Sequence, residues 1–346
     1  MPYIVKYSLQ RIFLLIITTF IILTLTFFLV KALPDAAMSG NQVAQYAFCN
    51  NQVELGYYLR FTSEQSGYGK ALLIYKSPDG MMAYFYKKPI IAQYAAWLTG
   101  IFTKWNWGTS SAVTSGASAM YIIGHRLPPS IYINLITMVI AIPLGFLFGI
   151  IAALRKNRWQ DNLISTLVMV MISVPSFVTI SIFMLIFCFQ AHLLPPAWTT
   201  TQGPAKYAQS FVIPVMSMTF GTVAVFTRYT RAELTEVMSS EFLLLARTKG
   251  LNKRQCIVRH ALRNSMVPIV PMIIGEFIGI LSGSVILEQF YTIPGIGGLF
   301  IECINLKDWN VLLVDMAVYT MIGLFANLMV DLSYGLVDPR IRMGAK

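Results

Sequence analysis

The chain has 346 residues, of which 56% are hydrophobic and only 12% are charged, and its formal net charge is +11. Soluble proteins of this size carry about 25% charged residues, so the composition indicates a polytopic membrane protein. Lys and Arg gather in loops between apolar runs, which reflects orientation in a bilayer and not nucleic-acid binding. The Cys and His residues have no metal-like spacing, so no metal is expected. The sequence leaves open whether two of Cys49, Cys188 and Cys303 form a disulfide.

The first apolar run, residues 12–30, follows the cations Lys6 and Arg11. It is too long for the apolar core of a signal peptide, so residues 1–33 are expected to form a cytoplasmic N-terminus and a retained first membrane helix. Residues 34–126 are polar and mixed, which predicts an extracytoplasmic domain inserted after that helix. Within it, residues 90–102 predict an amphipathic helix that lies near the membrane.

Three tryptophans, Trp97, Trp105 and Trp107, lie near the end of this predicted domain. One interpretation is an aromatic anchor at the membrane interface, where Trp is enriched. The other is a platform on which a ligand stacks. The sequence leaves both open.

Residues 127–346 predict a membrane core of five further helices. The first of these contains Gly145 and Gly149, a GxxxG pair that allows two helices to approach closely. The second has Pro175 near its middle, where a proline is expected to kink the helix. The five predicted crossings are residues 131–154, 163–189, 211–226, 267–287 and 311–333.

The distribution of cations orients these six predicted crossings. Short outer loops hold only Lys206 and Lys307. The predicted inner segments hold many more cations, so the positive-inside rule places both termini in the cytoplasm. Outside the long loop described next, the inner cations are Lys6, Arg11, Arg155, Lys156, Arg158, Arg340, Arg342 and Lys346.

The inner loop at residues 228–266 is unusually long and basic. Residues 243–249 favour helix, and Gly250 is expected to stop that helix in a left-handed conformation. Asn252 then caps a second helix, with Gln255 as the capping-box partner. In that helix one face is predicted to hold Ile257, Val258, Ala261 and Leu262. A solvated loop that only fixes topology needs neither cap, so the pattern favours a docking surface for a cytoplasmic partner.

The stretch RTKGLNKRQCIVRHALRN resembles the cytoplasmic coupling loop of bacterial ABC importer permeases of the oligopeptide/dipeptide family. The resemblance extends to HRLPPSI, FYTIPGIGGL and LSYGLVDPR, and so covers most of the chain. It implies an all-α type I importer permease fold with six transmembrane helices. It also implies that the loop contacts an ATPase subunit through Ala246, Arg247, Lys249, Gly250 and Asn252. Leu244, Leu245 and Arg263 depart from the general importer motif.

The resemblance further implies a set of partners: a homologous second permease, two ATPase subunits that hold ATP and Mg, an extracellular substrate-binding protein and membrane lipid. This chain has no GxxxxGK[ST] motif, so ATP hydrolysis is expected elsewhere and no cofactor is expected on it. Peptide is the expected solute, and nickel, glutathione or another small solute is the alternative.

Two groups of residues are candidates for the transport path. Glu276 falls near the middle of a predicted crossing, where a carboxylate is costly unless it faces protein or water. Together with Gly279 and Ser282 it is a candidate lining of the path, or a structural partner of another helix. Gly275, Gly279 and Gly283 form a seam for close packing. The family resemblance implies that the turn with Pro294, Gly295 and Gly297 forms part of an outer gate. Asp315 is expected to reach the outer interface.

Two other classes of function fit the sequence less well. An intramembrane enzyme needs a nucleophile, a base or metal ligands that converge at membrane depth, and Glu276 and Asp315 form no such motif. A scaffold that docks a partner and moves nothing leaves the membrane carboxylate and the prolines unexplained.

Overall fold

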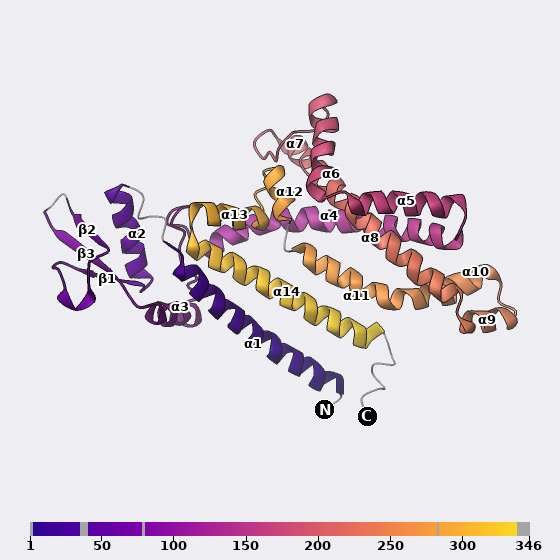
Figure 1. The fold of residues 1–346 in the computed structure, drawn as a ribbon, viewed down its shortest axis with the longest axis horizontal. Coiled ribbons are helices and arrows are strands. Elements are labelled where there is room, and N and C mark those ends of the chain that lie inside the picture. Colours follow the sequence, from indigo (N-terminus) through magenta and orange to yellow (C-terminus); the bar gives the residue numbers. More distant parts are fainter. Residues whose placement is uncertain (1–2, 35–40, 78–79, 282–283, 338–346) are drawn as a thin grey trace. The chain divides into compact units, whose positions relative to one another are not determined.

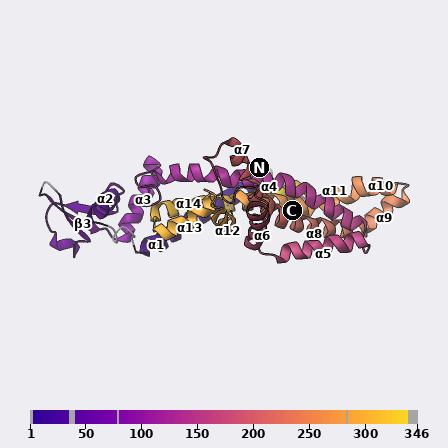
Figure 2. The same ribbon diagram turned by 90° about the horizontal axis from the view of Figure 1, so that it is seen from above.

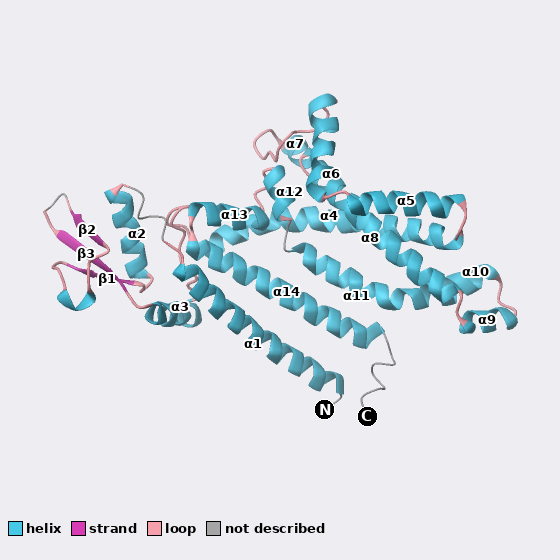
Figure 3. Cartoon of the chain, viewed as in Figure 1, coloured by secondary structure: helices cyan, strands magenta, loops and turns pink. Residues whose placement is uncertain are grey.

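The computed structural model describes residues 3–34, 41–77, 80–281 and 284–337, and the described chain is mainly helical (Figures 1 and 3). It divides into two compact units. One unit contains residues 1–16, 128–298 and 321–346, and the other contains residues 17–127 and 299–320. Both units contain parts of helices α1 (Tyr3–Ala32), α4 (Ala119–Leu154), α13 (Ile296–Leu306) and α14 (Trp309–Val337).

The unit that contains residues 17–127 includes a small sheet that the sequence did not predict. Helix α2 (Gln42–Glu54) precedes β1 (Tyr58–Phe61), a short 3₁₀ helix η2 (Ser66–Tyr68), β2 (Leu73–Lys76) and β3 (Met82–Lys87). The strand order is β1-β3-β2 with both pairs antiparallel, and the strands gather beside α2 in Figure 3. Helix α3 (Ile90–Lys104) follows β3 and confirms the predicted helix at residues 90–102.

Aromatic side chains form the core of this unit. Trp97 and Trp107 are only 3% and 8% exposed, and the ring of Trp97 lies 5.0 Å from that of Phe27 in α1. Trp97 and Trp107 are therefore core residues. For these two, both the interpretation as an anchor at the membrane interface and the interpretation as a ligand platform were wrong. Trp105 differs, because 68% of it is exposed.

A buried carboxylate ties the loop before α4 to the start of α14. Oδ2 of Asp308 accepts hydrogen bonds from the hydroxyl of Ser110 (2.6 Å) and from the backbone amides of Ser111, Ala112 and Val113 (3.0, 2.9 and 3.1 Å). In the second turn of α14, Asp315 is fully buried. The expectation that Asp315 reaches the outer interface was therefore wrong, because α14 turns this side chain into the protein interior.

Helix α8 (Val212–Met238) is central to the other unit. It packs against α5 (Trp159–Ser173), α6 (Ser176–Phe183) and α11 (Leu262–Leu281), and both views show α5 beside it (Figures 1 and 2). A Cβ atom at Gly145 or Gly149 of α4 would lie 2.5 Å from the Cβ of Phe226 or Thr230. The predicted close approach at this GxxxG pair is thus confirmed, with α8 as the neighbouring helix.

The predicted third crossing is broken into two helices. α5 ends at Ser173, α6 begins at Ser176, and the axes bend by 100° across Val174 and Pro175. Proline lacks the amide that would continue the helical hydrogen bonds, which explains the position of the break. A π-helical turn, η3 (Met184–Gln190), extends α6. The short helix α7 (Pro204–Gln209) then leads into α8.

Within the described residues, four helices are long and apolar enough to cross a membrane: 9–32, 119–154, 204–238 and 309–333. The bent pair α5 and α6 makes five if it is a single span. The predicted crossing at residues 267–287 covers most of α11, residues 282–283, which lie outside the described part, and the beginning of α12 (Val285–Phe290). The total of six crossings therefore stays a prediction.

All four cysteines are buried and form no disulfide.

Candidate functional site

The predicted docking segment begins later than expected, because residues 228–238 continue α8. After Ser239 the chain forms α9 (Glu241–Thr248), and Gly250 adopts the predicted left-handed conformation with φ of +89°. The amide of Leu251 bonds to the carbonyl of Ala246 at 3.3 Å, and that of Gly250 to Arg247 at 3.0 Å. These bonds form a Schellman motif, so the predicted helix stop is confirmed.

The second predicted cap is also confirmed. Oδ1 of Asn252 accepts a hydrogen bond from the backbone amide of Gln255 at 2.8 Å, and Oε1 of Gln255 accepts one from the amide of Asn252 at 3.1 Å. This reciprocal pair is a capping box, which satisfies two amides that a helix start would leave unpaired. Gly250 and Asn252 therefore define a tight turn between two helices, α9 and α10 (Lys253–Gln255).

The helix that follows is not a regular α-helix. After α10 comes a π-helical turn, η4 (Cys256–Ala261), which runs directly into α11. Hydrogen bonds from residue i to i+5 widen the turn and change which residues share a face. As a result Ile257 and Ala261 are buried while Val258 is 56% exposed. The prediction that Val258 shares their face was wrong for this reason.

A small apolar core holds the coupling segment, defined as residues 239–262, against the ends of α4 and α8. Leu243, Ala246, Cys256 and Ala261 pack with Ala153 and Leu234. Ala246, a predicted contact residue, is only 8% exposed, so it lies on the face of α9 that packs against this core. The other predicted contact residues Arg247, Lys249, Gly250 and Asn252 are exposed.

The outer face of α9 carries apolar side chains that the sequence analysis did not single out. Phe242, Leu244 and Leu245 are 42%, 63% and 60% exposed. In the sequence, Leu244 and Leu245 stand out only as departures from the general importer motif. Their position beside Leu243, which is buried, was the signal available in the sequence, because consecutive leucines on a short helix cannot all face the same core.

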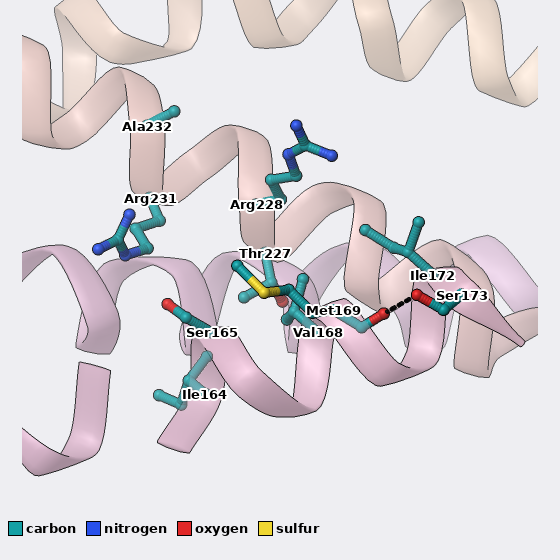
Figure 4. A pocket seen from close by; sticks show the side chains of 10 residues that line it. All are labelled: Ile164, Ser165, Val168, Met169, Ile172, Ser173, Thr227, Arg228, Arg231 and Ala232. Atoms are coloured by element: carbon teal, nitrogen blue, oxygen red, sulfur yellow. Dashed lines mark hydrogen bonds between the residues drawn. The ribbon is translucent and has the colours of Figure 1, made fainter. Parts of the chain in front are cut away.

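A groove of about 400 Å³ lies between α5 and α8 (Figure 4). Figure 4 shows Arg231 and Thr227 directed towards α5, whereas the guanidinium of Arg228 points away from it. Arg231 forms a bidentate ion pair with the buried Asp161, with Nη2 and Oδ2 2.9 Å apart. Asp161 also accepts a bond from the amide of Asn157 at 2.9 Å. The charges therefore join the start of α5 to α8 and are largely structural.

The predicted outer turn is organised by a residue that the sequence analysis missed. Glu288 of α12 is 3% exposed, and its Oε2 accepts a hydrogen bond from the amide of Gly298 at 2.7 Å. A Cβ atom on Gly295 would overlap the carboxyl group of Glu288 and the hydroxyl of Ser130, and one on Gly297 would lie 3.0 Å from Oε2. The glycines thus let the turn close around the carboxylate, while Pro294 precedes them in the same turn.

Ser130 of α4 connects this turn to another helix. Its hydroxyl donates a hydrogen bond to Oε1 of Glu288 at 2.7 Å, and the amide of Ile296 bonds to the same hydroxyl at 3.2 Å. Helix α12, which carries Glu288, lies outside the four candidate membrane spans. Burial raises the pKa of Glu288, and the hydrogen bonds from Ser130 and from backbone amides lower it in part. The only local signal in the sequence was a single acid just before a glycine-rich turn.

The candidate path residues are only partly placed. Glu276 is half-buried in α11, and Gly279 lies in the same helix. Ser282 and Gly283 lie outside the described residues. A Cβ atom at Gly275 would make an ordinary 3.5 Å contact with Val330 of α14, which is consistent with close packing at the start of the seam.

Apolar helices of spanning length, together with a capped segment that presents an apolar and basic face, define a multi-pass helical membrane protein. The family described as "Binding-protein-dependent transport system inner membrane component" matches residues 145–343. The dipeptide transport system permease protein DppB of Lactococcus lactis subsp. cremoris is 34% identical over 98% of this chain and all of that protein. The chain is thus a transport permease and belongs to the family of binding-protein-dependent transport system inner membrane components.

Other relatives carry related names. DppB of Bacillus subtilis is 30% identical over 99% of both chains. The glutathione transport system permease protein GsiC of Escherichia coli K12 is 30% identical over 64% of this chain and 70% of that protein. Among solved structures, the inward-facing MetNI methionine ABC transporter has a TM-score of 0.45 at 13% identity and covers 62% of this chain and 97% of that chain.

Proposed function

We propose that this chain is one of two homologous permease subunits of an ATP-driven importer, and that its solute is a short peptide. The observation that carries the proposal is the similarity to a dipeptide permease along essentially the whole length of both proteins. The relative named for glutathione aligns over a smaller share of this chain, so peptide is preferred over glutathione, nickel or another small solute.

The coupling segment is the proposed contact with an ATPase subunit. Its exposed face combines the apolar side chains of Phe242, Leu244 and Leu245 with the cations Arg247 and Lys249. A short helix whose C-terminal end is capped and whose buried face is packed transmits displacement better than a mobile loop. Two such ATPase subunits would bind ATP and Mg and supply the energy, while this chain performs no catalysis of its own.

The remaining parts fit the same scheme. An extracellular binding protein would deliver the peptide, and both termini of this chain would lie in the cytoplasm, in accordance with the distribution of cations. Glu276 and Gly279 of α11, with Ser282, would line the path shared with the second permease. The turn with Pro294, Gly295 and Gly297, closed around Glu288, would form part of the outer gate.

Uptake by intact cells tests this function. A strain that lacks only this gene should lose uptake of a labelled dipeptide and regain it when the gene is restored. Excess unlabelled dipeptide should compete, whereas excess glutathione or Ni²⁺ should not. Normal dipeptide uptake in the deletion strain, or loss of glutathione or nickel uptake instead, would refute the peptide assignment and favour the corresponding alternative solute.

A further inference from the structure

Helix α3 has two apolar faces, and only one of them is covered. The covered face carries Tyr94, Trp97 and Ile101, which pack in the core of their unit. The other face carries Ile91 and Phe102, which are 75% and 77% exposed, with Ala95 between them. Positions 91, 95 and 102 follow the helical spacing i, i+4, i+11 and therefore form one stripe. Trp105, which is 68% exposed, follows directly at the C-terminal end of the helix.

The covered face places α3 at a definite depth along α1. The hydroxyls of Tyr94 and Thr24 are 2.7 Å apart, and the ring of Tyr94 lies 5.2 Å from that of Phe28. Both α1 residues belong to the candidate span 9–32. At 1.5 Å per residue they lie roughly 6–12 Å before the end of α1 at Ala32. Helices that lie in the membrane interface bury their apolar face about 5–10 Å into the boundary between headgroups and acyl chains.

The flanking residues fit this location. Lys87 and Lys88 precede α3, and Lys104 lies in its last turn and is exposed. Lysine stems extend along apolar surface while the ammonium group reaches the polar headgroups. Exposed Trp at a helix end is typical of the same boundary.

We propose that α3 is an interfacial helix, and that the stripe of Ile91, Ala95 and Phe102, together with Trp105 at the helix end, is immersed in the lipid of the outer leaflet. Lipid is preferred as the occupant because α3 packs against α1, and α1 also has an exposed apolar surface within a candidate span. Phe20, Ile21, Leu25 and Leu29 on that surface are 48%, 50%, 59% and 71% exposed within a candidate span. The helix would thereby hold the sheet-containing part of its unit at a fixed height above the bilayer. The inference does not depend on which solute is transported.

Fluorescence quenching tests the proposal directly. The importer complex is purified with Ile91→Cys, Phe102→Cys or Glu64→Cys, and the introduced thiol is labelled with a polarity-sensitive maleimide dye. Glu64 is the matched control, because it is exposed in the same unit but lies on a polar loop. The four native cysteines are buried, so they react slowly under native conditions. The labelled complexes are reconstituted in vesicles of phosphatidylglycerol and phosphatidylethanolamine.

Lipids with a nitroxide near the headgroup should quench the dye at positions 91 and 102 several-fold more than at position 64, and aqueous iodide should show the opposite order. Equal iodide quenching at all three positions would overturn the proposal. It would also be overturned if lipid nitroxides had no effect and protection from iodide arose only after the extracellular binding protein was added, since the stripe would then be a protein-docking face.

Discussion

The hydroxyl of Ser130 in α4 donates a hydrogen bond to the carboxylate of Glu288 in α12, although the two residues are 158 positions apart. The same carboxylate binds the amide of Gly298 at the far side of the glycine-rich turn. One buried acid therefore fixes the position of three segments: α4 at Ser130, the short helix α12 and the start of α13. The turn cannot move without the loss or exchange of these hydrogen bonds.

Substitution of Gly295 by Ala should destabilise the protein, because the added methyl group would overlap both Glu288 and Ser130. Overpacking of this kind costs about 1–3 kcal/mol. The measurement is the thermal unfolding midpoint of the detergent-purified complex. Gly221→Ala in α8 is the control, because a Cβ atom there meets nothing within 4 Å and should be neutral or slightly stabilising. An equal midpoint for both variants would contradict the description of the turn.

Loss of Arg231 should be severe, because it leaves the carboxylate of Asp161 buried without its ionic partner. Asp161 is only 1% exposed, although the side chain of Arg231 is 34% exposed, and a buried polar group that loses its partner costs about 1–3 kcal/mol. Arg231→Gln should therefore lower the unfolding midpoint or the amount of protein in the membrane, and a second change, Asp161→Asn, should restore part of the loss. Arg228→Gln is the control: Arg228 has no acidic partner among the described residues and should tolerate the change.

A substitution at position 250 tests backbone conformation without a steric clash of the added Cβ atom. No atom would contact a Cβ there, but φ is +89°, which β-branched residues avoid and Asn tolerates better. Gly250→Val should thus impair dipeptide uptake and stimulation of the ATPase, with normal amounts in the membrane, whereas Gly250→Asn should retain most of both activities. Normal uptake by the Val variant would argue against the proposed role of the coupling segment.

The capping box gives a graded version of the same test. Asn252→Ala removes the side-chain acceptor for the amide of Gln255 and should cost about 1 kcal/mol. Asn252→Asp keeps an acceptor at this position. We expect faster amide hydrogen exchange across residues 249–256 in the Ala variant and little change in the Asp variant. Identical exchange in the two variants would mean that the cap does not hold the turn.

Local features of the coupling segment were predictable, because each depends on residues that are close in sequence. Gly250 stops α9 and Asn252 pairs with Gln255 as their identities indicate. The apolar runs likewise predicted most helices. Pro175 marked a kink, but its magnitude of 100° depends on what the two halves pack against.

Features that depend on distant partners were not predictable. Glu288 has no pattern that indicates Ser130, and Trp97 has none that indicates Phe27. The three strands of the sheet are short, and their sequences mix polar and apolar residues, so no strand pattern was evident. Val258 was misplaced because a periodicity of 3.6 residues was assumed where the backbone forms a π-turn.

The π-turn η4 also stores one surplus residue between α10 and α11, within the coupling segment. If this turn rewound into regular α-helix, every residue before it would rotate by roughly 100° about the helix axis, the angle that one residue occupies. Deletion of one residue from 256–261 would impose that rotation permanently. The exposed leucines of α9 would then face a different direction while both caps stayed intact, so the orientation of the docking face is set by the winding of a single helical turn.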